Sequence, residues 1–164
     1  MNPWKCQKYR KIYDGSVRTG IYLRFEKGID PRLRALFLDF ARWLRIKYEF
    51  PIRVNVYIQN REKVRLLSGA TAFGSFRWFG AMDEPYIRIP AAYDVESTPE
   101  RSVQETHESI LSSFVHELTH YFQWVNQLEQ TDRSSEWQAN YYRYRIIEQY
   151  YQDRKQKWRE CPCE

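Results

Sequence analysis

The sequence predicts one α+β domain in which a strand, a helix, three strands and two helices follow one another along the chain. Two kinds of apolar periodicity support this prediction, because some segments alternate residue by residue and others repeat every three or four residues. The 164 residues contain no repeat, low-complexity run or flexible linker, so residues 1–164 are expected to form a single domain. Residues 1–18 and 159–164 are expected to be peripheral tails.

The first strand and the first helix are separated by a helix-start signal. The segment "TGIYLRFEK" at 19–27 alternates apolar and polar side chains, as a half-buried strand does. Asp30 then provides an N-cap, and Pro31 occupies the first helical position, where its missing N–H costs nothing. Pro51 blocks further extension of the helix. The apolar residues at helical spacing are Leu33, Leu36, Phe37, Phe40, Ala41 and Leu44.

Three further strands are expected before the second helix. "IRVNVYIQ" at 52–59 alternates, and "YIRIP" at 86–90 is a short strand that ends at a proline. "ATAFGSFRWF" at 70–79 is typical of a strand, and Gly74 in its middle indicates a bulge or a close approach of the backbone. Residues 60–69 show no clear pattern. The side chains of the second strand expected to face inward are Ile52, Val54, Val56 and Ile58.

Two helices complete the predicted domain, over about 104–128 and about 133–158, after a loop at 91–103. The first of them has an apolar stripe that can anchor it in the core and against the sheet. His116 and His120 lie off this stripe, so the opposite side of the helix can line a cleft. The stripe consists of Leu111, Phe114, Leu118, Tyr121, Val125 and Leu128.

The segment "FVHELTHYF" at 114–122 has the spacing of a zinc site. His116 and His120 are four residues apart, so on a helix their imidazoles can point at one ion. Glu117 is rotated by about 100° from His116, which places it beside the ion, where a carboxylate can take a proton from zinc-bound water. His107, the other histidine, is expected to be a surface or first-turn residue and not a ligand.

A catalytic zinc site needs a third protein ligand. Glu136, near the start of the last helix, can face back toward His120 if the two helices pack together. Glu129 and Asp132 are conceivable ligands, but both are expected in the connection between the helices. Asn140 is one turn beyond Glu136 and is expected to orient a ligand. A purely structural interpretation of Glu136 is a favourable charge at a helix N-terminus.

The pair "HELTHYF" and "EWQAN" resembles the gluzincin zinc peptidases, whose third ligand is a glutamate on the next helix. Within that group the chain is most similar to ImmA/IrrE-type metallopeptidases and to the single-domain minigluzincins, over about residues 111–145. The resemblance implies a small zincin-like domain with its mixed sheet packed on the active-site helix. It also implies that an edge strand binds extended substrate, and Ala72, Phe73 and Gly74 are the candidate substrate-binding residues.

The function predicted from these residues is zinc-dependent endopeptidase activity on a peptide or protein substrate, with one Zn²⁺ ion and Glu117 as general base. A second donor to the transition-state oxyanion is expected from Tyr141, Tyr142 or Tyr144. Arg143 is interpreted as a surface cation, and contact with a carbonyl or carboxylate is the alternative.

Two alternatives stay open beside the peptidase. One is a non-catalytic, zinc-stabilised or metal-free module that binds protein or nucleic acid. The other is a peptidase that its own C-terminal segment, after about residue 158, holds latent.

Composition and charge narrow the class of protein. The net charge of +5 suits an acidic partner, but the cluster Lys5, Lys8, Arg10 and Lys11 is interpreted as a solvated face, and nucleic acid is not the expected ligand. No run approaches the roughly 18 to 20 apolar residues of a membrane span, and no signal peptide is present, so a cytoplasmic protein is expected.

The three cysteines, Cys6, Cys161 and Cys163, cannot all pair within one chain. Reduced thiols are the favoured interpretation for an intracellular protein. A disulfide between the two ends of the chain and a thiolate metal site are the alternatives.

Overall fold

The structure is a computed structural model that describes residues 1–5, 18–79 and 84–160. Four strands form the main sheet in the order β1 (Ile21–Phe25), β2 (Val54–Gln59), β6 (Tyr86–Pro90) and β5 (Ser75–Arg77). β1, β2 and β6 are parallel neighbours, and β5 is antiparallel to β6, so the sheet is mixed. The long helices are α1 (Pro31–Lys47), α2 (Glu100–Val125) and α3 (Asp132–Glu160). The predicted α+β class is therefore confirmed.

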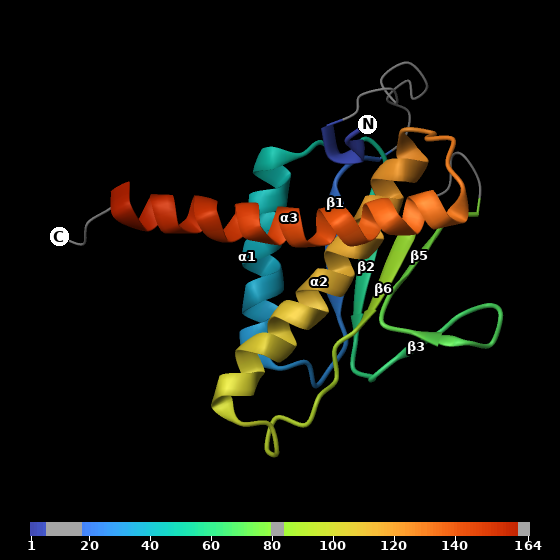
Figure 1. Cartoon of the computed structure of the whole chain (residues 1–164). Coiled ribbons are helices and arrows are strands. Elements are labelled where there is room, and N and C mark those ends of the chain that lie inside the picture. Colours follow the sequence, from blue (N-terminus) through green and yellow to red (C-terminus); the bar gives the residue numbers. More distant parts are fainter. Residues whose placement is uncertain (6–17, 80–83, 161–164) are drawn as a thin grey trace.

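The helices are arranged in layers on one face of the sheet (Figure 1). The inward side chains of β2 are fully buried, as the alternation predicts, whereas Tyr22 and Tyr57 on the other face are exposed. α1 and α2 meet through Phe37 and Phe114, whose ring centroids are 5.3 Å apart. α3 lies across α1 and α2 (Figure 1). The Tyr150 ring packs edge-on against the Phe40 ring of α1. This packing fixes the position of the start of α3 relative to α2.

The start of α1 follows the local signals in the sequence. The Asp30 carboxylate accepts a hydrogen bond from the backbone N–H of Arg32 at 2.7 Å, and Pro31 is the first helical residue. The helix ends at Lys47, before Pro51. β1 is shorter than the alternating segment, and its buried side chain is Ile21.

The prediction of one strand over 70–79 is wrong. β4 (Thr71–Ala72) pairs antiparallel with β3 (Val64–Arg65) in a separate two-stranded sheet, and β5 joins the main sheet. The turn between β3 and β4 contains Gly69 at φ 86°, a conformation that glycine adopts without strain. The chain therefore changes sheets between β4 and β5, although its apolar pattern is continuous.

α2 differs from the predicted helix at both ends. It begins at Glu100, with Pro99 as the N-cap residue and a favourable acidic residue in the first turn. It ends at Val125, where Gln127 adopts φ 50° and the N–H of Leu128 donates to the carbonyl of Gln123 at 3.0 Å. Leu128 therefore lies beyond the helix and is not part of the buried stripe. The other five stripe residues are fully buried.

The N-terminal five residues are not a peripheral tail. η1 (Pro3–Lys5) is a short 3-10 helix, and the Trp4 side chain is only 5% exposed. Its indole packs against Tyr48 and Phe122 at centroid distances of 4.9 and 4.6 Å. The prediction of a tail over 1–18 is thus wrong for residues 1–5.

The three cysteines, together with Lys8, Arg10 and Lys11, lie outside the described residues, so their predicted roles stay predictions. Within the described ranges, none of the helices combines the length and the apolar character needed to cross a bilayer.

Candidate metal centre

The three predicted ligands meet where the start of α3 crosses α2. The Nε2 atoms of His116 and His120 are 3.1 Å apart. The Glu136 carboxylate places Oε2 3.3 Å from the His116 Nε2 and Oε1 3.1 Å from the His120 Nε2. The imidazoles are largely buried, with 15% and 18% of their side-chain surface exposed, whereas the Glu136 side chain is 58% exposed. The trio therefore combines two fixed nitrogen donors with one oxygen donor at the edge.

The spacing of these donor atoms fits a tetrahedral zinc ion. Two ligand atoms at about 2.0–2.1 Å from a shared tetrahedral ion are about 3.3 Å apart. The two Nε2 atoms are separated by 3.1 Å, and each lies 3.1–3.3 Å from one of the two Glu136 oxygens, so both separations are close to this value. Burial, followed by the neighbouring charge of His120, lowers the pKa of His116 to about 4. The His116 imidazole is therefore neutral at physiological pH and keeps a lone pair for a metal. His116, His120 and Glu136 are the described residues that could hold the ion.

The two histidines differ in their support. The His120 Nδ1 contacts the Gln123 Oε1 at 2.8 Å, whereas the His116 Nδ1 is buried without a hydrogen-bond partner among the described residues. A side-chain hydrogen bond with Asn140 raises the pKa of His116, against the larger effect of burial. The buried His116 Nδ1 nevertheless has no partner of normal hydrogen-bond geometry among the described residues. The predicted orienting role of Asn140 therefore stays a prediction, and the glutamine provides the support that the geometry shows.

Glu117 lies beside the trio and is held in a polar but poorly solvated position. Burial, reinforced by the negative charge of Glu136, raises the pKa of Glu117 to about 8, although the backbone N–H of Phe76 opposes the shift by donating to it. The backbone of Gly74 passes directly over this carboxylate. The close-approach interpretation of Gly74 is thus confirmed, and a carboxyl group with this pKa can both accept and return a proton near neutral pH.

The trio and Glu117 line an open cleft of about 780 Å³ between β5, the two helices and their connection. Of the three candidate substrate-binding residues, Ala72 and Gly74 line this cleft. Phe73 does not: the residue is 64% exposed, and the Lys63 ammonium lies over its ring, 5.4 Å from the centroid. The chain turns between β4 and β5, and this turn directs Phe73 away from the cleft.

The candidate oxyanion donors do not line the cleft. Tyr141 and Tyr144 are 41% and 61% exposed on the outer side of α3, and each accepts a hydrogen bond from an arginine of the same helix. Tyr142 is half-buried, and burial raises its pKa. Arg143 stacks on the Tyr144 ring and lies close enough to lower the pKa of His116. Asp132 lines the cleft but is not part of the trio.

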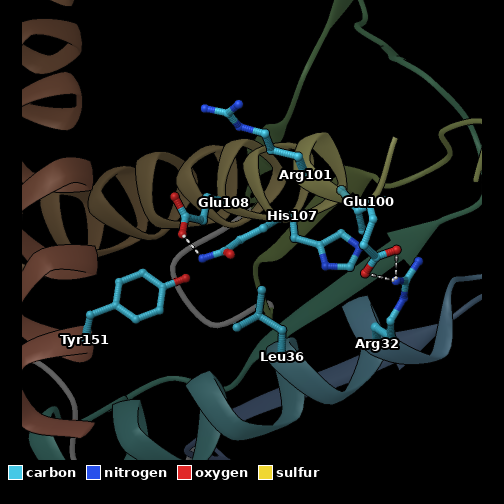
Figure 2. A pocket seen from close by; sticks show the side chains of 9 residues that line it. Arg32, Leu36, Glu100, Arg101, His107, Glu108 and Tyr151 are labelled. Atoms are coloured by element: carbon cyan, nitrogen blue, oxygen red, sulfur yellow. Dashed lines mark hydrogen bonds and ion pairs between the residues drawn. The ribbon is translucent and has the colours of Figure 1, made fainter. Parts of the chain in front are cut away.

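His107 lies in a second cavity, of about 470 Å³, beside the N-terminal half of α2 (Figure 2). The expectation of a surface residue is wrong, because His107 is only 7% exposed and its Nε2 contacts the Tyr93 hydroxyl at 2.7 Å. As expected, it is not among the three described residues that could hold a metal ion. Arg32 and Glu100 on the cavity wall form an ion pair at 2.9 Å, so their charges are already compensated (Figure 2).

Several residues of the site were not identified from the sequence. Gln123 and Ser135 contact the His120 ring, and Trp78 forms part of the cleft wall. A glutamine three residues after His120 is on the same side of the helix, and this spacing is a signal that could have indicated Gln123. The other contacts join distant segments, which local patterns do not reveal.

No family model, no curated protein and no solved structure matches this chain. The resemblance to gluzincins consequently stays an expectation based on "HELTHYF" and "EWQAN". The basis for a function is the chemistry of the trio, of Glu117 and of the cleft that they share.

Proposed function

We propose that the protein is a zinc-dependent endopeptidase of the gluzincin type, with a zincin-like fold. The observation that carries the proposal is the convergence of three donor atoms within 4.8 Å, in a cleft that also holds the Glu117 carboxylate. One Zn²⁺ ion would be held by His116, His120 and Glu136. When bound, zinc supplies a Lewis acid that polarises a carbonyl and acidifies a water molecule.

The protein's own part in the reaction is proton transfer by Glu117. Its side chain lies on the wall of the cleft, and its pKa near neutrality suits a group that accepts a proton from water and later gives it to the departing amine. The Phe76 N–H that donates to this carboxyl group fixes its orientation. Gly74 leaves room for it, because any side chain there would meet the carboxylate.

The edge of the main sheet favours a peptide as the substrate. β5 is the terminal strand of the sheet, and its residues Ser75, Phe76 and Arg77 line the cleft. Backbone N–H and C=O groups on such an edge can pair with an extended peptide, as a further strand. The Phe76 N–H is not among them, because it donates to Glu117. An open cleft along a strand edge accommodates chain on both sides of a bond, which favours an endopeptidase.

One wall of the cleft consists of aromatic rings. The Phe76 ring stacks on the Trp78 ring at a centroid distance of 5.4 Å, and Trp124 lies 6.0 and 6.1 Å from these two rings. Trp78 is 50% exposed, so part of its indole is available to a substrate. We therefore infer that a peptide with a large apolar side chain beside the cleaved bond is preferred.

The decisive experiment compares the wild-type protein with Glu117→Gln. The wild-type protein is expected to bind about one zinc ion and to cleave an unbiased peptide library. Glu117→Gln is expected to keep the zinc and the fold but to lose activity by at least about 100-fold, because it removes the base alone. Elemental analysis, circular dichroism and mass spectrometry of the cleaved peptides measure these three quantities. Glu108→Gln, on the same helix but facing the second cavity, is the matched control with unchanged activity.

Two results would contradict the proposal. Native-rate cleavage by Glu117→Gln would exclude its role as base. Stoichiometric zinc in a wild-type protein that cleaves no peptide would instead identify a zinc-stabilised binding module.

A further inference from the structure

A hydrogen-bonded network of amides connects His120 with the N-terminal residues of the chain. The Gln123 Oε1 contacts the His120 Nδ1 at 2.8 Å and accepts from the Ser135 hydroxyl at 2.7 Å. The Gln123 Nε2 donates to the Ser135 carbonyl at 3.0 Å and to the Gln138 Oε1 at 2.9 Å. The Gln138 Nε2 in turn donates to the carbonyl of Met1 at 2.9 Å. All four hydrogen-bonding positions of the Gln123 amide are thus occupied.

Two backbone carbonyls determine the direction of this network. A carbonyl oxygen only accepts, so the amide NH₂ of Gln138 must face the carbonyl of Met1. The Gln138 Oε1 must then face Gln123. The amino group of Gln123 must likewise face the Ser135 carbonyl and the Gln138 Oε1. Rotating the Gln123 amide would place its oxygen against two other acceptors. Both glutamines are almost fully buried, at 6% and 8% exposure, so water cannot compensate such a mismatch.

The fixed amide selects one tautomer of His120. Because the Gln123 Oε1 is an acceptor, the His120 Nδ1 must carry the proton and donate it. In the neutral ring the Nε2 then keeps its lone pair, and this is the atom that faces His116 and Glu136. A ligand histidine with its other ring nitrogen held by a hydrogen bond is a more basic and better oriented ligand.

The N-terminal segment is itself held firmly in place. The Trp4 Nε1 donates to the Oγ1 of Thr119 at 3.1 Å, and Thr119 is the residue directly before His120. The Asn126 Nδ2 donates to the carbonyl of Pro3 at 3.1 Å, and Asn126 is fully buried. The indole of Trp4 is buried against aromatic rings of α2 and the residue after α1. These contacts fix the carbonyl of Met1 relative to α2 and α3.

We propose that residues 1–4 are a positioning element of the metal centre, which acts through Gln138 and Gln123 to hold His120 in the tautomer that binds metal. We call Gln123, Gln138 and the N-terminal segment positioning residues, because none of them supplies one of the three donor atoms. The inference rests on the proposed metal site but not on peptidase activity. Its consequence is that damage to the N-terminal segment weakens metal binding at a distance.

The first test measures the tautomer in the metal-free protein. Long-range proton–nitrogen NMR spectra, recorded at mildly alkaline pH with ¹⁵N-labelled histidine, distinguish a protonated Nδ1 from a protonated Nε2. His120 is expected to be protonated at Nδ1 in the wild-type protein and to become a mixture of tautomers in Gln123→Met. Gln138→Met is expected to produce a smaller change in the same direction. An unchanged His120 spectrum in a folded Gln123→Met protein would overturn the proposal.

The second test measures zinc affinity by competition with a chromophoric chelator. Gln123→Met is expected to weaken zinc binding by about 10- to 100-fold, and Gln138→Met by about tenfold or less. Gln152→Met is the control, since this exposed glutamine of α3 contacts Glu148 of the same helix and not the N-terminal segment. It should leave the zinc affinity unchanged. Equal affinities for Gln138→Met and Gln152→Met would overturn the proposal.

The third test connects the N-terminal segment with Gln138. A variant without residues 1–3 is expected to bind zinc as weakly as Gln138→Met, and the combination of both changes is expected to be no weaker than either alone. Additive losses would show that the segment acts only through general stability and would contradict the proposal. Failure of the wild-type protein to cleave peptides would contradict the peptidase function and leave all three results interpretable.

Discussion

The backbone at Gly74 approaches Glu117 so closely that a Cβ atom on Gly74 would lie 2.7 Å from the carboxylate Oε1 and 2.8 Å from Cγ. Gly74 does not have the positive φ that Gly20, Gly28 and Gly69 adopt. Glycine is therefore required at position 74 because a side chain has no room there, and not because of the backbone conformation. The link between β4 and β5 thus shapes the surroundings of the proposed base, and this relationship connects the strand edge with the chemistry.

Gly74→Ala is expected to displace the Glu117 carboxylate and to reduce peptide cleavage by about 10- to 100-fold, because misplacement of about 1 Å costs that much. Zinc content should be unchanged, since the three atoms nearest to the new methyl group all belong to Glu117 and not to a ligand. Steady-state kinetics and elemental analysis measure the two quantities. The double variant Gly74→Ala/Glu117→Gln should be no less active than Glu117→Gln alone. A further loss in the double variant would show that Gly74 acts on something other than the base.

Trp78→Ala is expected to raise KM by about tenfold for peptides with a large apolar side chain beside the cleaved bond, with a small effect on kcat. The reason is that the substitution removes the exposed ring of the aromatic wall and leaves the trio and Glu117 in place. Trp137→Ala is the matched control, because Trp137 is 67% exposed on α3 and lies outside the cleft. Equal KM values for the two variants would contradict the proposed subsite.

Asp30→Asn tests the acid dependence of stability. Burial alone would raise the pKa of Asp30, but hydrogen bonds from the Tyr93 hydroxyl and from Arg32 lower it from 3.8 to about 2. The carboxylate therefore contributes stability that is fully present above about pH 4 and is lost as the pH falls toward 2. The Asp30 side chain is only 5% exposed, but solvent screens its exposed partner Arg32. The contribution of the carboxylate to the free energy of unfolding is therefore about 1–2 kcal/mol.

Urea unfolding at several pH values measures this contribution as the difference between the wild-type protein and Asp30→Asn. The difference should be about 1–2 kcal/mol at neutral pH and should shrink steadily below pH 4. Burial lowers the pKa of the neighbouring His107, so wild-type stability also falls as the pH drops below its ordinary value of 6.5. A difference that is independent of pH would show that Asp30 acts only as the N-cap of α1.

Gln127→Gly is expected to stabilise the protein by about 0.5–1 kcal/mol. Gln127 has φ 50° at the end of α2, and the left-handed conformation costs a residue with a Cβ about 1–2 kcal/mol, part of which the greater unfolded-state entropy of glycine offsets. Thermal unfolding should show an increase of roughly 1–4 °C in Tm. Gln127→Ala keeps the Cβ and should bring no gain. An equal effect of the two substitutions would exclude backbone strain as the cause.

The parts of the fold that were predicted correctly depend on neighbouring residues. The buried face of β2, the cap at Asp30 and the helical stripe of α2 all follow from periods of two or three to four residues. The break between β4 and β5 was missed because both halves have strand-like composition. The periodicity describes which face is buried, but it does not identify the sheet to which each half belongs.

The sequence alone determined which atoms could bind a metal, because residues four apart on a helix lie on one face and His116 and His120 have this spacing. It also indicated Glu136, through its place on the next helix. Only the tertiary structure decided that each Nε2 atom lies 3.1–3.3 Å from the other or from a Glu136 oxygen, that Gly74 makes room for Glu117, and that Met1 reaches Gln138. The physical reason is that these contacts join residues distant in sequence, and the packing of α3 across α2 sets them.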